Sequence, residues 1–405
     1  MDGAGQEARI SGRSRHRSAQ VAALLQLPLL LACASAQAQP VLIVFTGTHA
    51  DPSYLAQHMD WVEARPVDGV VVNDYLGRNL LRTSLKSDTP QALDASGAVT
   101  YAAAAAGLSP LKGAFRKFHH NFVRVNLSLI GPPPLLTDEA GWQVVDASAA
   151  NYARAVQDTG LEGVFFDNEA YLHPPLAGHP NGADYWRYED QLALAGERPS
   201  AMSQAAMLDL ARRRGRELMQ AFVRGYPGIV MIVAHSPVEG CRAWQAASGH
   251  FAVQNYLLGP FAAGMVEGTS GAARFVDGGE DYDWRSPRDF ELAKTWRNGS
   301  ASPGVTNCPF MDAALAASWP QKVSIAFSTF DKERASLTTN TWTPITNVPA
   351  FQSVLTNALR ATDQYVWHYA EWQDWWGNDT ESALQPWLQA ISAARQQVGM
   401  AAPQP

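Results

Sequence analysis

Short apolar runs, each followed by a polar patch and then by a helical pattern, recur along this chain from residue 41 onward. Eight such runs can be counted, at residues 41–45, 69–72, 122–129, 163–166, 229–234, 273–276, 322–327 and 364–369. β-Branched and aromatic residues dominate them, which is typical of strands buried on both faces. Strands that alternate with helices in this way predict a parallel sheet built from βαβ units.

Helical periodicity occupies the connections, most clearly over residues 202–224 and 351–361. Eight strand–helix units are the number that closes a barrel, so we predict a single-domain α/β fold, a (β/α)8 TIM barrel, over residues 39–405. Two domains remain the alternative for a chain of this length. Residues 250–258 could form a ninth strand, but we interpret them as irregular structure that leads into a helix over residues 261–266.

The first 38 residues have the pattern of a signal peptide. Basic residues cluster at 9–17, residues 21–32 are nearly all apolar, and Ala36-Gln37-Ala38 supplies a small-x-small cleavage site. The apolar run is too short to span a bilayer, and no later stretch reaches the roughly 20 apolar residues that a transmembrane helix needs. A competing pattern before Cys33 resembles a lipoprotein cleavage box, which would leave a lipid anchor on that residue. Both interpretations predict a secreted or periplasmic protein.

Composition narrows the range of partners and cofactors. The net charge of −7 makes nucleic acid an unsuitable partner. Beyond the signal peptide only Cys241 and Cys308 remain, too few for a disulfide scaffold, and they could form one bridge or two free thiols. No P-loop, G-x-G-x-x-G or G-x-S-x-G motif follows a strand. Only His49 lies near the first strand, where a metal-dependent barrel hydrolase would carry H-x-H, so we expect neither metal nor cofactor.

Polar side chains follow the predicted strand ends, which meet at the face of a barrel where active sites lie. They are Asp74, Asn126, Asp167, Glu169, His235, Asp277, Glu280, Asp331 and Glu371. A mouth rich in acids suits a neutral, polyhydroxylated substrate, because carboxylates accept hydrogen bonds from hydroxyls and can act as acid, base or nucleophile. We therefore expect a carbohydrate as the substrate.

Asp167 and Glu169 carry the strongest signal. Two residues apart on a strand, they point to the same face, and two close carboxylates push their pKa values apart, so that one can hold a proton while the other is ionised. Alternatively, Asp167 caps the following helix or orders the loop through Asn168. In Asp277-Gly278-Gly279-Glu280 the glycines allow a sharp turn, and the segment supplies either the second catalytic acid or only that turn.

The remaining candidates are expected to contact the sugar. Flat aromatic rings pack against the C–H faces of sugars, and several aromatic residues lie near the strand ends. Trp367, inside a strand, is expected in the core, whereas Trp372, Trp375 and Trp376 are expected to form a sugar platform. Asp167, Glu169, Glu280 and Glu371 are the candidate catalytic residues. The candidate substrate-binding residues are Asp74, Asn126, Asn168, Tyr171, His235, Asp277, Trp284, Trp372 and Trp375.

The segment GVFFDNEAY around Asp167 resembles the fourth-strand motif of several barrel glycosidases. It is similar to the Asp-x-Glu of family 18 chitinases, which implies Glu169 as the acid, although Phe165 stands where that family has a further Asp. It is also similar to the Asn-Glu of retaining clan A enzymes, whose strand-seven nucleophile has no counterpart here. A third likeness, to the endo-α-galactosaminidase type, implies Asp167 as the acid. Residues 273–290 resemble bacterial proteins assigned to the glycoside hydrolases by sequence alone.

The sequence therefore predicts an exported glycoside hydrolase that cleaves a glycan by carboxylate acid/base chemistry. The alternative is a catalytically inactive, carbohydrate-binding barrel. A polysaccharide lyase is a more distant third interpretation, because a lyase acting on uronic acids needs a basic group to neutralise the substrate carboxylate.

Overall fold

The computed structural model describes residues 39–400 with short gaps. The gaps are 83–88, 129–130, 173, 178–181, 197–200, 239–240, 242–256, 301, 309, 336–340 and 378–380. The predicted signal peptide, with Cys33, and most of the possible ninth strand therefore lie outside the described residues.

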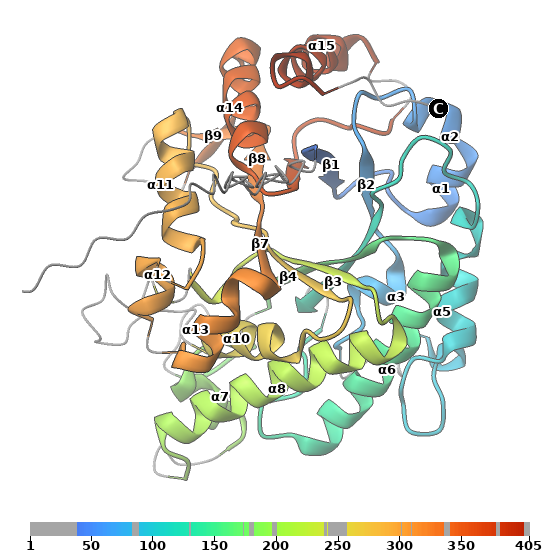
Figure 1. Ribbon diagram of the computed structural model, residues 1–405. Helices are drawn as coiled ribbons and strands as arrows, with labels where there is room; N and C mark the ends of the chain where they lie inside the picture. Colours follow the sequence, from blue (N-terminus) through green and yellow to red (C-terminus); the bar gives the residue numbers. More distant parts are fainter. Residues whose placement is uncertain are drawn as a thin grey trace, which may run out of the picture. The chain divides into compact units, whose positions relative to one another are not determined.

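Parallel strands form the wall of a (β/α)8 barrel (Figure 1). They are β1 (Val41–Thr46), β2 (Gly69–Val72), β3 (Phe122–Ser128), β4 (Gly163–Ala170), β5 (Val230–Val233), β6 (Arg274–Asp277), β7 (Val323–Ile325), β8 (Phe327–Phe330) and β11 (Tyr365–Ala370). Their order is β7-β6-β5-β4-β3-β2-β1-β11-β8, and every pairing is parallel. Each of the eight predicted runs forms a strand, so the fold prediction is confirmed.

The seventh run is interrupted at Ala326 and gives two of these strands. Its first half, β7, pairs with β6, and its second half, β8, pairs with β11. The backbone N–H of Ala326 still donates to the carbonyl oxygen of Asp277 at 2.8 Å. The strands at the two ends of the sheet order, β7 and β8, are thus consecutive in the chain, and their connection closes the barrel.

Helices fill the connections between the strands. They are α1 (Pro52–Gln57), α2 (Met59–Val62), α3 (Tyr75–Arg78), α5 (Tyr101–Leu108), α6 (Glu139–Thr159), α7 (Tyr188–Leu194), α8 (Gln204–Gly225), α10 (Leu258–Gly268), α11 (Pro287–Arg297), α12 (Pro303–Thr306), α13 (Ala313–Lys322), α14 (Val348–Ala361) and α15 (Glu381–Gln397), with 3-10 turns η1 (Pro90–Ala92) and η2 (Ser109–Leu111). A small hairpin, β9 (Lys332–Arg334) and β10 (Trp342–Pro344), follows β8. The helices predicted from periodicity correspond to α8, α10 and α14. Among the described residues, no helix has the length and apolar character that crossing a membrane requires.

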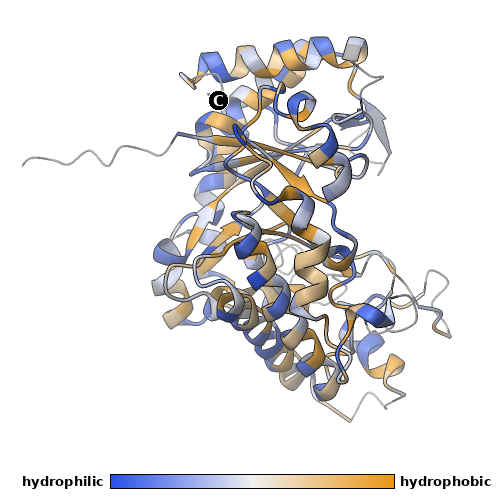
Figure 2. Cartoon of the chain, turned by 90° about the vertical axis from the view of Figure 1, so that its right-hand side faces the viewer, coloured by the Kyte–Doolittle hydropathy of each residue, from blue (hydrophilic) through white to orange (hydrophobic). Residues whose placement is uncertain are grey.

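Two hydrophobic clusters follow from the alternation of side chains along each strand. One lies between the strands and the surrounding helices, and the other fills the barrel interior. In the interior, the ring centroid of Phe165 lies 4.9 Å from those of Phe45 and Trp367. Trp367 is fully buried, as predicted. Figure 2 shows the strands largely apolar and the long helices with polar positions among the apolar ones.

A disulfide bond joins Cys241, shortly after β5, to Cys308, between α12 and α13. Their Cα atoms lie 5.1 Å apart, within the range that a bridge requires. Of the two possibilities that the sequence left open, the structure has the bridge.

Candidate active site

Strands β3 and β4 supply the polar floor of the barrel mouth. Phe122 and Phe165 belong to the interior cluster. Because every second residue of a strand points to the same side, Arg124, Asn126 and Asp167 also point into the barrel, further along the two strands. In the register of the two strands, Asn126 lies opposite Asp167, and the pairing becomes irregular beyond that point. The apolar interior therefore ends where the polar side chains begin.

Asp167 is a buried carboxylate held by three donors. Arg124 Nη2 donates to its Oδ2 at 2.6 Å, and Asn126 Nδ2 donates to the same oxygen at 2.7 Å. The Tyr171 hydroxyl lies 3.0 and 3.1 Å from its two oxygens. Burial by itself would lower the pKa of Arg124, but the charge and hydrogen bond of Asp167 outweigh it and raise that pKa. Asn126 and Tyr171, both predicted substrate contacts, thus hold a candidate catalytic carboxylate.

The end of β5 presents His235 to the barrel mouth. Asn168 fixes its backbone from both sides, since Asn168 Nδ2 donates to the His235 carbonyl oxygen at 2.9 Å and Asn168 Oδ1 accepts from His235 N at 3.0 Å. Asn168 is fully buried. In the structure it ties the end of β4 to His235, and the prediction that its side chain contacts substrate stays a prediction.

Two glycines after β6 bring Glu280 over the end of β5. A Cβ on Gly278 would lie 2.5 Å from the carbonyl oxygen of Val233, so only glycine allows this approach. Gly279 adopts a φ of 57°, in the left-handed region that glycine tolerates best. After this turn, the N–H of Glu280 donates to the carbonyl oxygen of Ala234 at 3.1 Å. The predicted turn therefore places the predicted acid, Glu280, over the end of β5.

Glu169, His235 and Glu280 meet at the mouth. His235 Nε2 lies 3.3 Å from Glu169 Oε1 and 3.6 Å from Glu280 Oε2. One nitrogen of His235 and one carboxylate oxygen from each glutamate all lie within 4.8 Å of one another. Tyrosine hydroxyls donate to both carboxylates, from Tyr171 to Glu169 Oε2 at 2.5 Å and from Tyr282 to Glu280 Oε1 at 2.7 Å. The site thus holds two close carboxylates with a histidine between them.

The two glutamates have opposite pKa shifts. Burial by itself would raise the pKa of Glu169, but the hydrogen bond and charge of His235, with smaller effects of Tyr171 and Arg124, hold it below its usual value. Burial raises the pKa of Glu280 to about 8, with further increases from the charges of Glu169 and Asp167 and a partial offset from His235. At neutral pH, Glu169 is therefore ionised and Glu280 carries a proton.

Burial and three neighbouring carboxylates raise the pKa of Tyr171 well above its usual value. The Tyr171 hydroxyl therefore stays protonated, and its single proton is shared between Glu169 and Asp167. The pKa of Tyr282 is raised for the same reasons, burial first and then the charge of Glu280. The sequence placed Tyr282 among the aromatic residues near the strand ends but gave no sign of its hydrogen bond to Glu280, and its ring packs on Trp367.

Glu169, His235 and Glu280 also have the donor types that a divalent cation accepts. The fit is partial, because the hydroxyls of Tyr171 and Tyr282 already donate to the two carboxylates. A cation would compete with these hydroxyls for the same side chains.

Two predicted binding carboxylates lie in structural contacts. Asp74 caps α3, accepting from Gly77 N at 3.0 Å, and also accepts from the Tyr152 hydroxyl at 2.8 Å. Asp277 is fully buried against Arg297, whose Nη1 donates to it at 2.7 Å. Both side chains are thus used in structural contacts, because a strand-end acid serves equally well as a helix cap or as half of a buried ion pair.

The β11 loop also differs from the prediction. Trp375 and Trp376 are fully buried, so they belong to the core and form no sugar platform. Trp372 is 60% exposed and remains available as a flat surface. Glu371 is half-exposed and pairs with Lys332 at 2.8 Å, and no contact found among the described residues joins it to Glu169 or Glu280.

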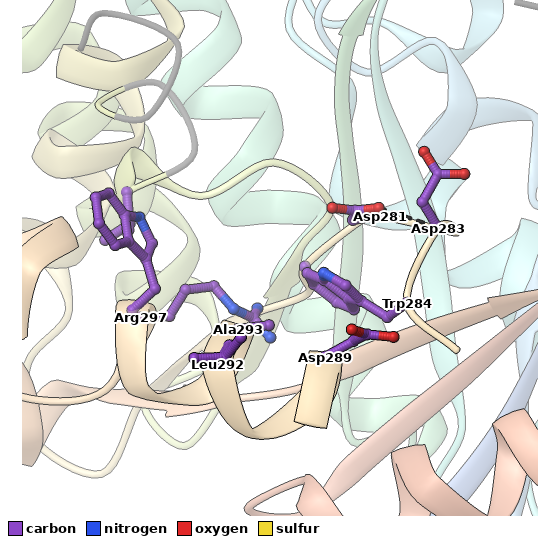
Figure 3. Close-up of a pocket in the computed structure, with 10 residues that line it drawn as sticks. Asp281, Asp283, Trp284, Asp289, Leu292, Ala293 and Arg297 are labelled. Carbon is purple, nitrogen blue, oxygen red and sulfur yellow. Dashed lines mark hydrogen bonds between the residues drawn. The ribbon is translucent and has the colours of Figure 1, made fainter. Parts of the chain in front are cut away.

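A cavity of about 490 Å³ lies behind the loop that carries Glu280 (Figure 3). Asp281, Asp283 and Trp284 line it together with residues of α11. Glu280 and Tyr282 alternate with these residues and contact the barrel interior instead. Trp284, a predicted substrate contact, therefore faces this cavity, and its ring packs against Phe327 at 5.1 Å.

No family model and no curated protein sequence matches this chain. Among solved structures, it is similar to a β-mannanase from the blue mussel Mytilus edulis, with 12% identity, a TM-score of 0.43 and coverage of 90% of this chain and 94% of that one. It is similar to a GH5-4 broad specificity endoglucanase from an uncultured bacterium, with 10% identity, a TM-score of 0.43 and coverage of 84% and 83%. It is also similar to a β-1,4-D-mannanase from Cryptopygus antarcticus, with 13% identity, a TM-score of 0.42 and coverage of 87% and 90%.

Proposed function

We propose that this protein is a retaining glycoside hydrolase in which Glu169 is the nucleophile and Glu280 is the general acid/base. The observation that carries the proposal is the pair itself, with oxygens of the two carboxylates within 4.8 Å and pKa values shifted in opposite directions. Retaining enzymes hold their two carboxyl groups about 5 Å apart, whereas inverting enzymes need about 6.5 to 9.5 Å to admit a water molecule. The assignment reverses the role that the sequence suggested for Glu169.

The chemistry follows from these protonation states. Ionised Glu169 attacks the anomeric carbon and forms a glycosyl–enzyme ester, while the glycosidic C–O bond breaks and Glu280 gives its proton to the leaving oxygen. Ionised Glu280 then takes a proton from water, and the resulting hydroxide oxygen bonds to the anomeric carbon and releases Glu169. Asp167 and Tyr171 position Glu169 through the hydrogen bonds of the Tyr171 hydroxyl.

A glycan screen followed by variants of both glutamates tests the proposal. On a cleaved aryl glycoside, Glu169→Ala and Glu280→Ala should each lose activity, and added azide should restore turnover. Azide would give the product of inverted configuration with Glu169→Ala and of retained configuration with Glu280→Ala. A reversed pattern would exchange the two roles, and wild-type rates in both variants would reject the site.

The alternative of an inactive sugar-binding barrel predicts a different result in the same screen. Glycans would then bind, with an affinity that falls in Trp372→Ala because this exposed ring offers a flat surface, but none would be cleaved. Cleavage that depends on Glu169 and Glu280 rejects this alternative.

We further propose that the protein acts on a glycan outside the cytoplasm. The signal-peptide pattern of residues 1–38 motivates the proposal, and the Cys241–Cys308 disulfide supports it because such bonds persist in oxidising compartments. Intact-mass analysis of the protein recovered from its native host should give a chain that begins near Gln39. An unprocessed Met1, or an acylated Cys33, would contradict simple secretion.

A further inference from the structure

Arg78 lies just beyond the end of β2, close enough to Arg124 for the charge of Arg124 to act on it. It ends α3, the one-turn helix that follows β2, and α3 packs against β3. A Cβ on the neighbouring Gly77 would lie 2.7 Å from the carbonyl oxygen of Arg124, so this turn rests directly on the residue that pairs with Asp167. Arg78 therefore belongs to the same sector of the mouth as the Arg124–Asp167 ion pair.

The guanidinium of Arg78 has no counter-ion in the part of the chain that the structure describes. The side chain is half-buried, and its Nε is buried without a hydrogen-bond partner. Burial and then the charge of Arg124 lower its pKa. Holding a charge of this kind without a partner costs free energy, and such costs concentrate at functional sites.

Other polar atoms in this sector also have unused hydrogen-bonding capacity. Among the described residues, Arg124 Nε, Asn126 Oδ1 and Ser128 Oγ are buried without partners, and all three side chains lie on the inward face of β3. Native proteins leave few buried polar groups unpaired, and a group of them on one strand calls for an explanation. A bound polar ligand, with its ordered water, provides one.

The acidic residues of the mouth do not balance Arg78. Asp167 is paired with Arg124, Glu371 with Lys332, Asp283 with Arg334 and Asp277 with Arg297. Glu280 is held in its protonated form, and ionised Glu169 already has His235 beside it and accepts from the Tyr171 hydroxyl. The mouth looks acidic in sequence, but these pairings remove most of its negative charge and leave a cation beside the sugar site.

We propose that the sugar bound at this site carries an anionic group, the carboxylate of a uronic acid or a sulfate ester, which pairs with Arg78. The inference rests on the proposed carbohydrate substrate and narrows its class. A guanidinium binds a carboxylate or a sulfate through two parallel hydrogen bonds, and the anion supplies the charge that a neutral hydroxyl cannot.

Binding to matched polysaccharides tests the proposal in a Glu280→Gln background, which prevents turnover. The probes are uronic-acid polysaccharides with their carboxyl-reduced forms, and sulfated polysaccharides with their desulfated forms. One acidic form should bind about 10- to 100-fold more tightly than its neutral counterpart, and added salt should weaken only the acidic form. Which pair shows the difference identifies the anion.

Arg78→Met should abolish the preference, and Arg78→Lys should keep part of it. The matched control is Arg116→Met, which removes an exposed arginine before the start of β3, where it lies 3.7 Å from Asp60. Arg116→Met should leave the preference unchanged. Because Arg78 makes no contact that folding depends on among the described residues, the melting temperature of Arg78→Met should not fall below that of wild type.

Several outcomes overturn the proposal: no acidic polysaccharide binds, acidic and neutral forms bind equally, or Arg78→Met keeps the preference. Failure of the proposed hydrolase function looks different. If the preference depends on Arg78 but the products carry a new C=C bond, the reaction is an elimination, and the anion site stands while hydrolysis is rejected. If such a preference is found and nothing is cleaved, the protein is an acidic-glycan binder.

Discussion

Two identical side chains, Glu169 and Glu280, have different protonation states because of their immediate neighbours. Glu169 lies beside His235 and accepts from Tyr171, and these contacts outweigh its burial. Glu280 is more deeply buried, and the charges of Glu169 and Asp167 raise its pKa further. The separation of their pKa values is what allows one to attack while the other donates a proton.

The pH dependence of catalysis should report this separation. Activity requires Glu169 ionised and Glu280 protonated, so kcat/KM should follow a bell-shaped curve whose alkaline limb falls near pH 8. Steady-state rates over pH 4 to 10 on any cleaved glycan measure it. An activity that keeps rising above pH 9 would contradict Glu280 as the acid.

The same pKa has a consequence for stability. Its folded-state value of about 8 lies above the usual 4.5, so between these pH values the unfolded chain releases the proton first and the free energy of unfolding falls as pH rises. Glu280→Gln removes this dependence. Relative to wild type, the variant should gain stability from pH 4 to pH 8, on the order of a few kcal/mol, in denaturant titrations.

Asp167 should be far more important for stability than an exposed acid at the same face. Asp167→Asn leaves Arg124 buried without a compensating charge, which typically costs about 3 to 5 kcal/mol. Glu371→Gln, which breaks the exposed pair with Lys332, is the matched control and should cost less than about 1 kcal/mol. Equal melting temperatures for the two variants would show that the buried pair contributes little.

At the residue scale, the sequence revealed the acids but not their partners. Asp167, Glu169 and Glu280 could be found because strand ends in a barrel meet at one face. Arg124 was missed although a signal existed. It lies inside the apolar run FVRVNLS, two residues before Asn126, and residues two apart on a strand point to the same side. Arg297 gave no such signal, because its contact with Asp277 comes from the far end of the helix that follows β6, 20 residues along the chain.

At the scale of elements, the loop after β11 is held by one side chain. Asp331, directly after β8, accepts from the backbone N–H groups of Glu371, Trp372 and Gln373, at 3.2, 2.7 and 2.8 Å. It is fully buried. This carboxylate fixes the loop from which Trp372 projects.

Asp331→Ala should therefore loosen the loop and raise KM more than it lowers kcat, with a stability loss of about 1 to 3 kcal/mol from the unpaired donors. Kinetics and thermal melting measure the two effects. Asp94→Ala is the control, because Asp94 accepts from the N–H groups of a turn between β2 and β3 in the same manner and should leave kinetics unchanged. A KM equal to wild type in Asp331→Ala would mean that the loop does not contact substrate.

Strands were predicted more completely than loops. Burial on both faces requires a continuous apolar run in each strand, and this run is visible in the sequence. In the β11 loop, the sequence does not distinguish an aromatic residue that faces solvent from one that lies in the core. Trp372 and Trp375 illustrate this, since three residues separate an exposed ring from a fully buried one.

For the whole molecule, the disulfide joins parts of the chain separated by 67 residues, a span that includes β6 and the loop with Glu280. Closing a loop of this size stabilises a fold by about 2 to 4 kcal/mol. A reducing agent should lower the melting temperature of wild type but not that of the Cys241→Ser/Cys308→Ser variant. An unchanged wild-type value under complete reduction would reject a stabilising role.

The interruption at Ala326 makes one joint of the barrel wall mechanically different from the others. Beyond it, β6 and β8 share no backbone ladder among the described residues, and side chains bridge the gap, with Arg297 Nη2 donating to Ala326 O at 2.7 Å and Ser328 Oγ donating to Gly279 O at 3.0 Å. A few side-chain hydrogen bonds break more readily than a continuous backbone ladder, so we expect the barrel wall to open locally here before it opens elsewhere. Amide hydrogen exchange should then be faster in β8 than in β1. The loop with Glu280 starts at this compliant edge and could adjust to a substrate without disturbing the rest of the wall.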